Sequence, residues 1–467
     1  MGTVVETRLA LAGHHHLELR RHLFLGDGKE AVAFALCGRA RRDGVEVLLV
    51  REVVPVPYAL CPVRTPTQVT WRGEALDAVL ARALEHDLGL LKVHSHPTGY
   101  ACFSSTDDEA DSALFPSVAG WLGDDRGPMA SAIMLPDGRM LGRSIWGGAI
   151  GPELQAIRVA GEDFQYWFPA CKSAAVPDHG LRVAQTFGDA TYAQLRQLKI
   201  GVVGCSGTGS PVAEQLARNG VGELVLVDGD AVEPKNLNRI LNSTKFDARA
   251  AVNKTLVLER TIEAMGLGTR VRAHARDLLD IEVLRDLSTC DLVFGCMDSV
   301  DGRHVLNKLA SAYLIPYIDV GVRLDADGKG GINSIWLAIH TLQPGGSSLK
   351  SRRVYDQQDL EAAFMRRESP QEYERLRRDG YIKGVRVDQP AVISVNMAAA
   401  SAAVNEFLAR LHGFRVKSNA GFAVRRICVT DPEASVDEGD GTPCAEMGKL
   451  QGSGDQDPFL GLMQLRE

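Results

Sequence analysis

Strands and helices alternate through the second half of the chain, and this pattern restricts the fold more than any other feature. From Leu198, the apolar run KIGVVG is followed by a glycine turn, the helical pattern PVAEQLARNG and a second apolar run, ELVLVD. A long helix over 253–265 and the runs VRAHA, DLVFGCMD and YLIPYIDVG come next. Strands alternating with helices form right-handed crossovers in a parallel sheet. The sequence therefore predicts an α/β domain with a mostly parallel sheet.

The first third of the chain has a different pattern. Short apolar runs from Val32 to Val54 are separated by charged or glycine turns, as in a β-meander. Apolar residues at helical spacing predict a helix over 73–89, and LLKVHSH then predicts a buried strand. A chain of 467 residues exceeds the size of a single core. We therefore expect domains over 1–150 and 181–430, a linker over 151–180 and a flexible acidic tail over 431–467.

The composition limits the classes of partner and the cellular compartment that we expect for this protein. The net charge is −7 and no block of basic residues occurs, which argues against a nucleic-acid partner. No apolar run is long enough to span a bilayer, so we expect a cytoplasmic protein without a membrane partner. The nine cysteines are scattered and include no CxxC pair, which favours reduced thiols over a disulfide framework.

The segment HSHPTGYACFSSTDD carries a candidate metal site. His94 and His96 are one residue apart, so on a strand both imidazoles point to the same face. With the carboxylate of Asp107 they form a donor set that suits a zinc ion with an open water position. Asp108 is an adjacent alternative ligand, but the spacing favours Asp107. A base must take the proton of the water, and Glu30 is the candidate.

The spacing of His94, His96, Ser104 and Asp107 resembles the JAMM motif of the JAB/MPN metalloproteases, and KEAVAFALCG resembles their upstream glutamate strand. The resemblance implies an α+β metallopeptidase domain in which His94, His96 and Asp107 bind zinc. Glu30 would be the general acid/base, and Ser104 would support the oxyanion. Relatives cleave after the C-terminal glycine of ubiquitin-like proteins or trim such proteins. The histidines at 14–16, by contrast, are expected to lie in a solvated loop.

A candidate nucleotide pocket follows the first strand of the second domain. Three glycines, Gly204, Gly207 and Gly209, lie between that strand and the next helix. Backbone amides at such a helix start can bind phosphates. Asp228, at the end of the following strand, is suited to a ribose hydroxyl. Glycines alone are weak evidence, because a strict G-x-G-x-x-G is not present.

The downstream segments VDGDAVEPKNLNRI, NKT and FGCMDSVDGR add specificity. Together with the glycine turn, in which Ser206 replaces one family glycine, they resemble the Rossmann-like ThiF/MoeB and ubiquitin-activating adenylyltransferases. Arg, Lys and Mg²⁺ in such a site stabilise the charge of ATP while a carboxylate attacks the α-phosphorus. The resemblance implies that Asp228 holds the ribose, that Asp298 binds magnesium, and that the triphosphate is contacted by Asn236, Arg239 and Lys254.

The same resemblance implies a homodimer through the adenylation domain, with Arg182 completing the site of a neighbouring subunit. Single residues of this set also have interpretations that involve no function. Lys254 and Arg303 on helices are more often solvated charges, and Asn236 and Asn238 are common turn residues.

The chain has no cysteine between Cys296 and Cys428, where many relatives carry a catalytic cysteine. Three alternatives follow, in order of preference. The enzyme adenylates only and passes the acyl group to a separate carrier; Cys428 or Cys444 is used; or a hydroxyl of Ser347 or Ser348 forms an ester. An unactivated serine is a weak nucleophile, which places the last alternative third.

These motifs predict a bifunctional enzyme of a bacterial-type ubiquitin-like system, with phage defence as a role of relatives that share this fusion. One domain would process or deconjugate a tail ending in glycine, the other would activate it with ATP, and a conjugating enzyme is a possible further partner. A second hypothesis is activation of a sulfur-carrier protein in biosynthesis. A third is that one domain is a non-catalytic docking module.

Overall fold

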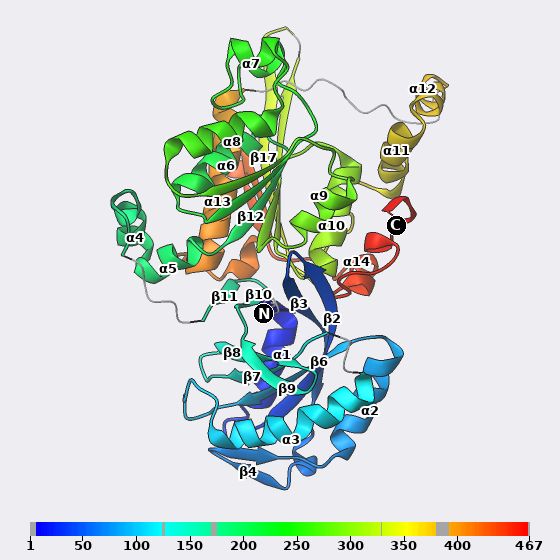
Figure 1. The fold of residues 1–467 in the computed structure, drawn as a ribbon. Coiled ribbons are helices and arrows are strands. Elements are labelled where there is room, and N and C mark those ends of the chain that lie inside the picture. Colours follow the sequence, from blue (N-terminus) through cyan, green and yellow to red (C-terminus); the bar gives the residue numbers. More distant parts are fainter. Residues whose placement is uncertain (1–5, 124–126, 170–174, 328, 380–391, 466–467) are drawn as a thin grey trace. The chain divides into compact units, whose positions relative to one another are not determined.

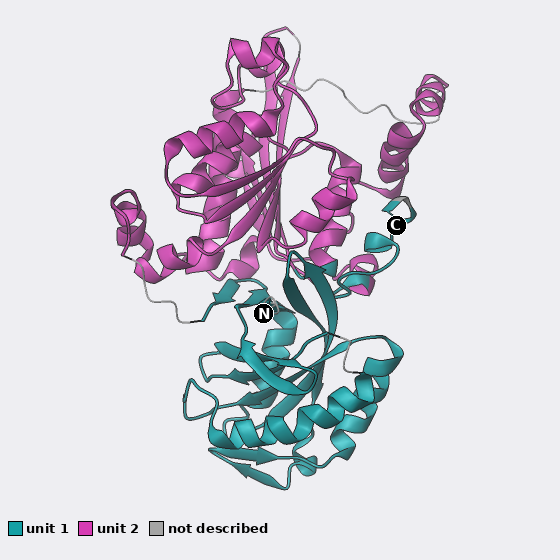
Figure 2. Ribbon diagram, in the orientation of Figure 1, with its two compact units in different colours: residues 1–172, 312–314, 450–467 teal, residues 173–311, 315–449 magenta. Residues whose placement is uncertain are grey.

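The computed structural model describes residues 6–123, 127–169, 175–327, 329–379 and 392–465. These residues divide into two compact units, coloured separately in Figure 2. Unit 1 comprises residues 1–172, 312–314 and 450–467, and unit 2 comprises residues 173–311 and 315–449. The eight described cysteines are free thiols, as expected. Cys171 lies outside the described residues.

Unit 1 is built on a nine-stranded mixed sheet in the order β11, β10, β1, β3, β2, β6, β7, β8, β9. The strands are β1 (Glu6–Ala12), β2 (Val32–Arg42), β3 (Val45–Pro55), β6 (Gly89–Ser95), β7 (Met129–Met134), β8 (Met140–Trp146), β9 (Ala149–Glu153), β10 (Ala156–Ala160) and β11 (Phe164–Trp167). A separate hairpin consists of β4 (Val63–Thr65) and β5 (Gln68–Thr70).

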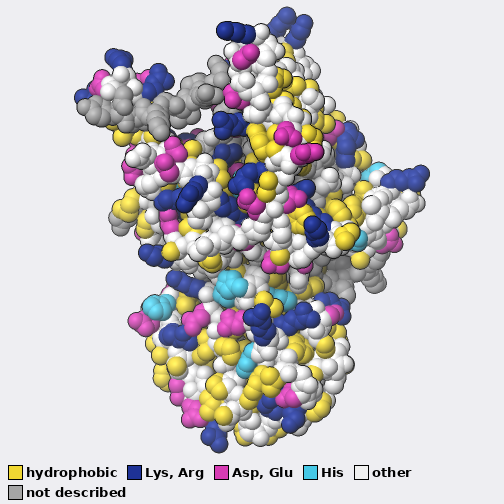
Figure 3. Space-filling model, turned by 180° about the vertical axis from the view of Figure 1, so that it is seen from behind, with side chains coloured by type: hydrophobic (Ala, Val, Ile, Leu, Met, Phe, Trp, Pro, Cys, Tyr) yellow, Lys and Arg dark blue, Asp and Glu magenta, His cyan; other side chains and the backbone are white. Residues whose placement is uncertain are grey.

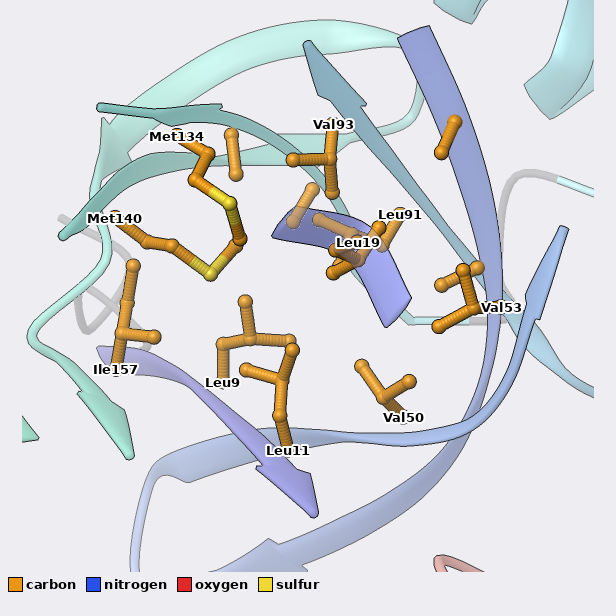
Figure 4. Packing of buried hydrophobic residues seen from close by; sticks show 14 of the residues in the cluster. Leu9, Leu11, Leu19, Val50, Val53, Leu91, Val93, Met134, Met140 and Ile157 are labelled. Atoms are coloured by element: carbon orange, nitrogen blue, oxygen red, sulfur yellow. The ribbon is translucent and has the colours of Figure 1, made fainter. Parts of the chain in front are cut away.

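Helices cover both faces of this sheet (Figure 1). On one face, Leu19 of α1 (Gly13–Leu23) packs with Leu91 and other residues of the central strands (Figure 4). On the other face, α2 (Glu74–Glu85) and α3 (Ser105–Leu122) pack against Phe34 and its neighbours. The alternation of β2 decides this division, because successive strand residues point to opposite faces.

Two of the pattern predictions are confirmed in unit 1, whereas the segment 151–180, expected to be a linker, supplies β10, β11 and part of β9 to the sheet. The helix expected over 73–89 is α2, and LLKVHSH supplies β6. The expected β-meander is instead a two-stranded hairpin, because VEVLLV and VVPVP belong to the single strand β3. Its turn is Asp43 and Gly44, with φ of 50° and 79°, which suits a tight hairpin.

The expectation of a solvated loop at residues 14–16 is wrong. All three histidines lie in α1, and His15 and His16 are buried. Nε2 of His16 bonds the carbonyl oxygen of Gly138 at 2.8 Å. Burial lowers the pKa of His15 to about 3, so its imidazole is neutral. Two of the three residues are part of the core face of the helix rather than of a polar loop.

Unit 2 contains an eight-stranded sheet in the order β14, β13, β12, β15, β16, β17, β18, β19. The first five are parallel and the last three are added antiparallel, which confirms a mostly parallel α/β sheet. The strands are β12 (Lys199–Val203), β13 (Glu223–Val227), β14 (Arg270–His274), β15 (Leu292–Gly295), β16 (Tyr317–Ala326), β17 (Ile332–Leu342), β18 (Val424–Cys428) and β19 (Val436–Glu438).

The helices of unit 2 include the two that the sequence predicts after the first and second strands. Asn253 caps the longer one, α8, with its side chain accepting from the backbone N–H of Thr255. The helices are α4 (Leu181–Phe187), α5 (Asp189–Leu195), α6 (Gly209–Arg218), α7 (Lys245–Arg249), α8 (Lys254–Met265), α9 (Ile281–Leu287), α10 (Val300–Ala312), α11 (Gln357–Glu368), α12 (Pro370–Arg378), α13 (Ile393–His412) and α14 (Ala445–Leu450).

The segment expected to be a flexible acidic tail carries regular structure instead. It supplies β19 to the sheet of unit 2, followed by α14. Further on, the backbone N–H of Asp455 donates to the carbonyl oxygen of Arg39 at 2.8 Å, and the N–H of Arg41 donates to its carboxylate at 2.8 Å. Composition predicted flexibility here, but backbone and carboxylate hydrogen bonds tie the segment to β2 within unit 1.

Charges of both signs are interspersed with apolar side chains on the face drawn in Figure 3. Within the described parts of the chain, no helix combines the length and the apolar character needed to cross a membrane.

Candidate functional site

The histidines and the aspartate of the JAMM-like motif lie together in unit 1. His94 is in β6, His96 follows the end of β6, and Asp107 is in the first turn of α3. Nε2 of His94 lies 3.1 Å from Nε2 of His96 and 2.9 Å from Oδ1 of Asp107. Nε2 of His96 lies 3.4 Å from Oδ2 of Asp107. Across the described ranges, no other trio of His, Cys, Asp or Glu is arranged to hold a metal ion.

The chemistry of this group fits a zinc ion. Two imidazole nitrogens and one carboxylate leave a fourth position for water. Burial opposes the ionisation of Asp107, but hydrogen bonds from His94 and His96 outweigh it and hold its pKa well below the ordinary range. Nδ1 of His96 donates to the carbonyl oxygen of Tyr100 at 2.7 Å, which keeps Nε2 directed at the group.

Ser104 caps α3 and orients the candidate ligand Asp107. Its hydroxyl donates to Oδ2 of Asp107 at 2.8 Å, and its oxygen accepts from the backbone N–H of Asp107 at 3.2 Å. The backbone N–H of Ser104 also donates to the same carboxylate oxygen at 2.7 Å, completing a capping box. In this arrangement the hydroxyl is bonded to the ligand, whereas the expected oxyanion role needs it to face substrate.

Glu30 lies just before β2 and reaches the same group. Its Oε1 is 4.0 Å from Nε2 of His96. Glu30 is 5% exposed, and burial raises the pKa of its carboxyl to about 7, although the nearby His96 opposes that shift. A carboxyl with a pKa near neutrality is suited to both accepting and returning a proton. The backbone N–H of Ala31 donates to the hydroxyl of Ser95 at 2.9 Å, and the N–H of Ser95 donates to the carbonyl oxygen of Ala31 at 3.0 Å, which holds the start of β2 beside the end of β6.

A cavity opens beside these residues. Its lining combines the candidate acid/base and ligands with the β4–β5 hairpin, and includes Glu30, Gln68, Val69, Trp71, His94 and Asp107. The candidate base and two candidate ligands are therefore reachable from one space.

In unit 2, the glycine turn follows β12 and leads into α6, as predicted. Gly204 has a φ of 88°, and a Cβ there would lie 2.6 Å from the carbonyl oxygen of Cys296. A Cβ on Gly209 would lie 1.7 Å from the carbonyl oxygen of Gly204. Only glycine fits this close backbone approach. At Gly207, a Cβ would lie 3.0 Å from Cδ of Arg239, so that arginine packs over the turn.

Asp228 and Lys254 lie next to the turn. The carboxylate of Asp228 accepts from the backbone N–H of Cys205 at 2.7 Å, and burial raises its pKa. Nζ of Lys254, at the start of α8, donates to Asp228 at 3.5 Å and to Asp230 at 2.7 Å. Lys254 is 6% exposed, so the alternative interpretation of this residue as a solvated charge on a helix is wrong.

The two asparagines of PKNLNR make local contacts, as expected of turn residues. Oδ1 of Asn236 accepts from the backbone N–H of Glu233 at 3.0 Å, which closes a short 3-10 turn over Pro234–Asn236. Asn238 accepts from Nη1 of Arg239 at 3.1 Å. A turn-forming role therefore accounts for the contacts of Asn236, and its contact with phosphate stays a prediction.

Asp298, the candidate magnesium ligand, is exposed just after β15. Arg303, in the first turn of α10, is not a solvated charge, because its Nε donates to the buried Asp319 at 3.1 Å. Arg182 lies on α4, where it is exposed and donates to Gln185 at 3.1 Å. The structure thus places Asp298 and Arg303 in the segment that follows β15, whereas the side-chain bond of Arg182 among the described residues stays within α4.

The hydroxyls considered as nucleophiles are engaged in structural contacts. Ser347 is 3% exposed, bonds to Asp440, and accepts from Nε of Arg352 at 2.7 Å. Ser348 is fully buried, and its oxygen accepts from the backbone N–H of Ser351 at 3.0 Å. Of the two cysteine alternatives, Cys428 is buried, whereas Cys444 is partly exposed.

Sequence comparison decides the family of the larger unit. The model of the ThiF family matches residues 180–427, more than half of the chain. The chain belongs to the ThiF family. A second model, for prokaryotic homologs of the JAB domain, matches residues 13–136 of this ThiF-family chain. Both resemblances drawn from the motifs are confirmed.

Curated relatives of this ThiF-family chain match it only in part. It is 31% identical over 143 residues to "Ubiquitin-like modifier-activating enzyme 5" of Bombyx mori, covering 29% of this chain and 36% of the relative. It is 28% identical over 189 residues to "Adenylyltransferase and sulfurtransferase MOCS3" of Drosophila persimilis, covering 38% of this chain and 41% of the relative. The chain thus spans well under half the length of these relatives.

Among solved structures, the chain is similar to E. coli MccB with ATP, at 18% identity and a TM-score of 0.43, covering 58% of this chain and 73% of that one. Another similar structure, of PaaA, has 17% identity and a TM-score of 0.42 over 59% of this chain and 87% of that one.

Several residues near the candidate metal ligands were not anticipated. Lys92, Asp111 and Arg143 form buried ion pairs beside α3. The available signal for Lys92 was its place as the only charged residue inside the apolar run LLKVHSH. Near the glycine turn, Asn396 of α13 donates to Oγ1 of Thr208 at 3.0 Å. No local sequence motif predicted this contact.

Proposed function

We propose that unit 2 uses ATP to adenylate the C-terminal glycine of a ubiquitin-like or sulfur-carrier protein, and that unit 1 is a zinc peptidase or isopeptidase acting on the same kind of tail. The observation that carries the first activity is the glycine turn beside Asp228 and Lys254 in a ThiF-family sheet. The second activity is supported by the grouping of His94, His96 and Asp107 next to a buried Glu30.

For adenylation, the backbone amides after Gly204 and the cations Lys254 and Arg239 would bind the phosphates of ATP. Asp228 would hold the ribose, which fits its place at the end of β13. The glycine carboxylate of the partner attacks the α-phosphorus, an acyl-phosphate bond forms, and pyrophosphate leaves. Magnesium held by Asp298 would neutralise charge on the phosphates.

For peptide cleavage, His94, His96 and Asp107 would hold zinc, which would activate a water molecule and polarise the scissile carbonyl. Glu30 would accept the proton of the attacking water on its carboxylate and return it to the leaving amine. The cavity that Glu30 shares with the β4–β5 hairpin would receive the tail.

The route that the activated acyl group takes depends on which nucleophilic side chains are accessible to it. Ser347 and Ser348 are buried and hydrogen-bonded, which makes an ester on either the least supported route. Transfer to a separate carrier stays the first choice, and Cys444 is the better placed of the two cysteine alternatives because it is partly exposed.

The sulfur-carrier alternative is favoured by one observation, the similarity to a relative named adenylyltransferase and sulfurtransferase. Homodimerisation through unit 2, with Arg182 reaching a neighbouring site, also belongs to this proposal. A docking role for one unit is the least supported alternative, because both residue groups needed for chemistry are present.

One experiment separates the two activities. The full chain is incubated with ATP, Mg²⁺ and candidate carrier proteins ending in glycine, and ATP–pyrophosphate exchange and intact masses are measured. We expect carrier-dependent exchange and, in a parallel reaction with a C-terminally extended precursor, zinc-dependent trimming. Lys254→Ala should abolish exchange and leave trimming intact, whereas His96→Ala should do the reverse. Exchange that survives Lys254→Ala would contradict the pocket assignment, and trimming that survives His96→Ala would contradict the metal assignment.

A further inference from the structure

A buried ion-pair cluster lies beside the candidate metal ligands of unit 1. Lys92 of β6 and Asp111 of α3 form an ion pair, and their side chains are 3% and 0% exposed. Arg143 of β8 adds two bonds to the same carboxylate, from Nη2 at 2.7 Å and from Nε at 3.1 Å. One carboxylate therefore joins two strands of the sheet to α3. We call Lys92, Asp111 and Arg143 the Asp111 cluster.

The cluster connects the two elements that carry the ligands. Lys92 and His94 are two residues apart on β6, so their side chains point to the same face of the sheet. Asp111 is one helical turn after Asp107, so these two carboxylates lie on the same side of α3. Fixing Lys92 against Asp111 therefore fixes the separation of the histidine-bearing strand and the aspartate-bearing helix.

Arg143 also contacts the first turn of α3 directly. Its Nη2 donates to the carbonyl oxygen of Asp107 at 3.3 Å, and its Nη1 pairs with Asp108. Its guanidinium carbon lies 3.9 Å from the centre of the Phe103 ring, a cation–π arrangement. Phe103 and Asp107 flank the cap residue Ser104, so a single side chain contacts the helix start on both sides of its cap.

Stability alone is a weak reason for such a cluster. Burying charges costs free energy, and well-packed apolar residues often serve stability equally well or better. What the charges add is direction, because the planar guanidinium presents several donors in a fixed geometry that lysine does not reproduce. The partners of metal ligands commonly determine how tightly the metal is bound.

We propose that Arg143 is a positioning residue of the metal site, and that with Lys92 and Asp111 it holds the first turn of α3 so that the carboxylate of Asp107 faces His94 and His96. The inference rests on the proposed zinc site. It goes beyond that site by assigning its geometry to β8, a strand that contributes none of the three candidate ligands.

The test measures metal binding by the full-length protein. Apo protein is titrated with Zn²⁺ against a chromophoric chelator, and the visible absorption spectrum of the Co²⁺-loaded protein reports the coordination geometry. We expect Arg143→Gln to weaken zinc binding by about 10- to 100-fold, the range seen when partners of metal ligands are removed. The intensity or position of the cobalt bands should change as well. Arg143→Lys, which keeps the charge but loses the fork, should not restore either readout.

Arg139→Gln is the matched control. Arg139 precedes β8, its side chain is 60% exposed, and it pairs with Asp137 rather than with α3. This variant should bind zinc like the parent protein. Thermal unfolding of each apo protein separates loss of fold from loss of positioning, and Arg143→Lys keeps the test decisive if Arg143→Gln does not fold.

Unchanged zinc affinity and an unchanged cobalt spectrum in folded Arg143→Lys and Arg143→Gln would overturn the positioning role and leave the zinc site standing. Absence of zinc binding by the parent protein would instead overturn the proposed function. The two failures are therefore distinguishable in the same titration.

Discussion

The hydroxyl of Ser104 lies 2.8 Å from Oδ2 of Asp107, so the residue that caps α3 also holds a candidate metal ligand. Ser104→Ala should lower stability by about 1 kcal/mol through the lost cap and weaken zinc binding by about 10-fold or more through the lost partner of the ligand. Chemical unfolding and chelator competition measure the two effects.

Thr244 offers the matched control for this substitution. In unit 2 it caps α7 with the same capping box, donating to Asp247 at 2.7 Å and accepting from its backbone N–H at 3.2 Å. Thr244→Ala should cost similar stability and leave zinc affinity unchanged. If Ser104→Ala bound zinc as tightly as Thr244→Ala, the proposed role of Ser104 in orienting the ligand would be contradicted.

Glu30 is predicted to act in proton transfer and not in holding the metal. Glu30→Gln keeps the shape of the side chain but cannot accept a proton, so cleavage should fall by about 10²- to 10⁴-fold. Zinc content, measured by elemental analysis, should stay unchanged. Glu46→Gln, which alters another buried carboxylate of unit 1, paired with Arg41 at 3.1 Å, should retain cleavage. Normal cleavage by Glu30→Gln would exclude Glu30 as the base.

The glycine turn predicts a steric effect on adenylation. A Cβ at Gly209 would lie 1.7 Å from the carbonyl oxygen of Gly204, so Gly209→Ala must displace the turn. We expect loss of ATP–pyrophosphate exchange with trimming by unit 1 retained. Gly448→Ala is the control, since a Cβ at that position of α14 meets no atom within 4 Å. Full exchange activity in Gly209→Ala would refute the turn as the phosphate site.

Buried histidines predict that stability declines in mild acid. Burial, reinforced by Arg352, lowers the pKa of His340 to about 3, below its ordinary value of 6.5. Between these values the unfolded chain binds more protons, so the stabilisation is present above about pH 6.5 and is lost as the pH falls towards 3.

Urea unfolding at pH 7.5, 6.5 and 5.5 measures this loss, for which one histidine contributes at most about 1.4 kcal/mol per pH unit. His340→Leu should flatten the decline in unit 2, whereas His179→Leu, at an exposed position, should not. An equal slope in the parent protein and His340→Leu would show that another group is responsible.

Local patterns predicted well where one physical requirement sets the residue type. The glycine turn after KIGVVG could be located because close backbone approach admits only glycine, and the HSH spacing because strand alternation directs both imidazoles to one side. Patterns failed where burial depends on distant segments. His15 and His16 resembled a polar loop, yet they belong to the buried face of α1.

By itself, the sequence determined the mostly parallel sheet of unit 2, the order of the two domain types along the chain, and the residue groups His94, His96 and Asp107 and Gly204 to Gly209. These follow from short-range periodicity and spacing. Tertiary structure decided that Lys254 is buried beside Asp228, that Arg303 pairs with the buried Asp319, that Ser104 bonds to Asp107, and that Arg143 reaches α3 from β8. The reason is that the free energy of a charged or polar side chain depends on the partners the fold brings to it, and those partners lie far away in sequence.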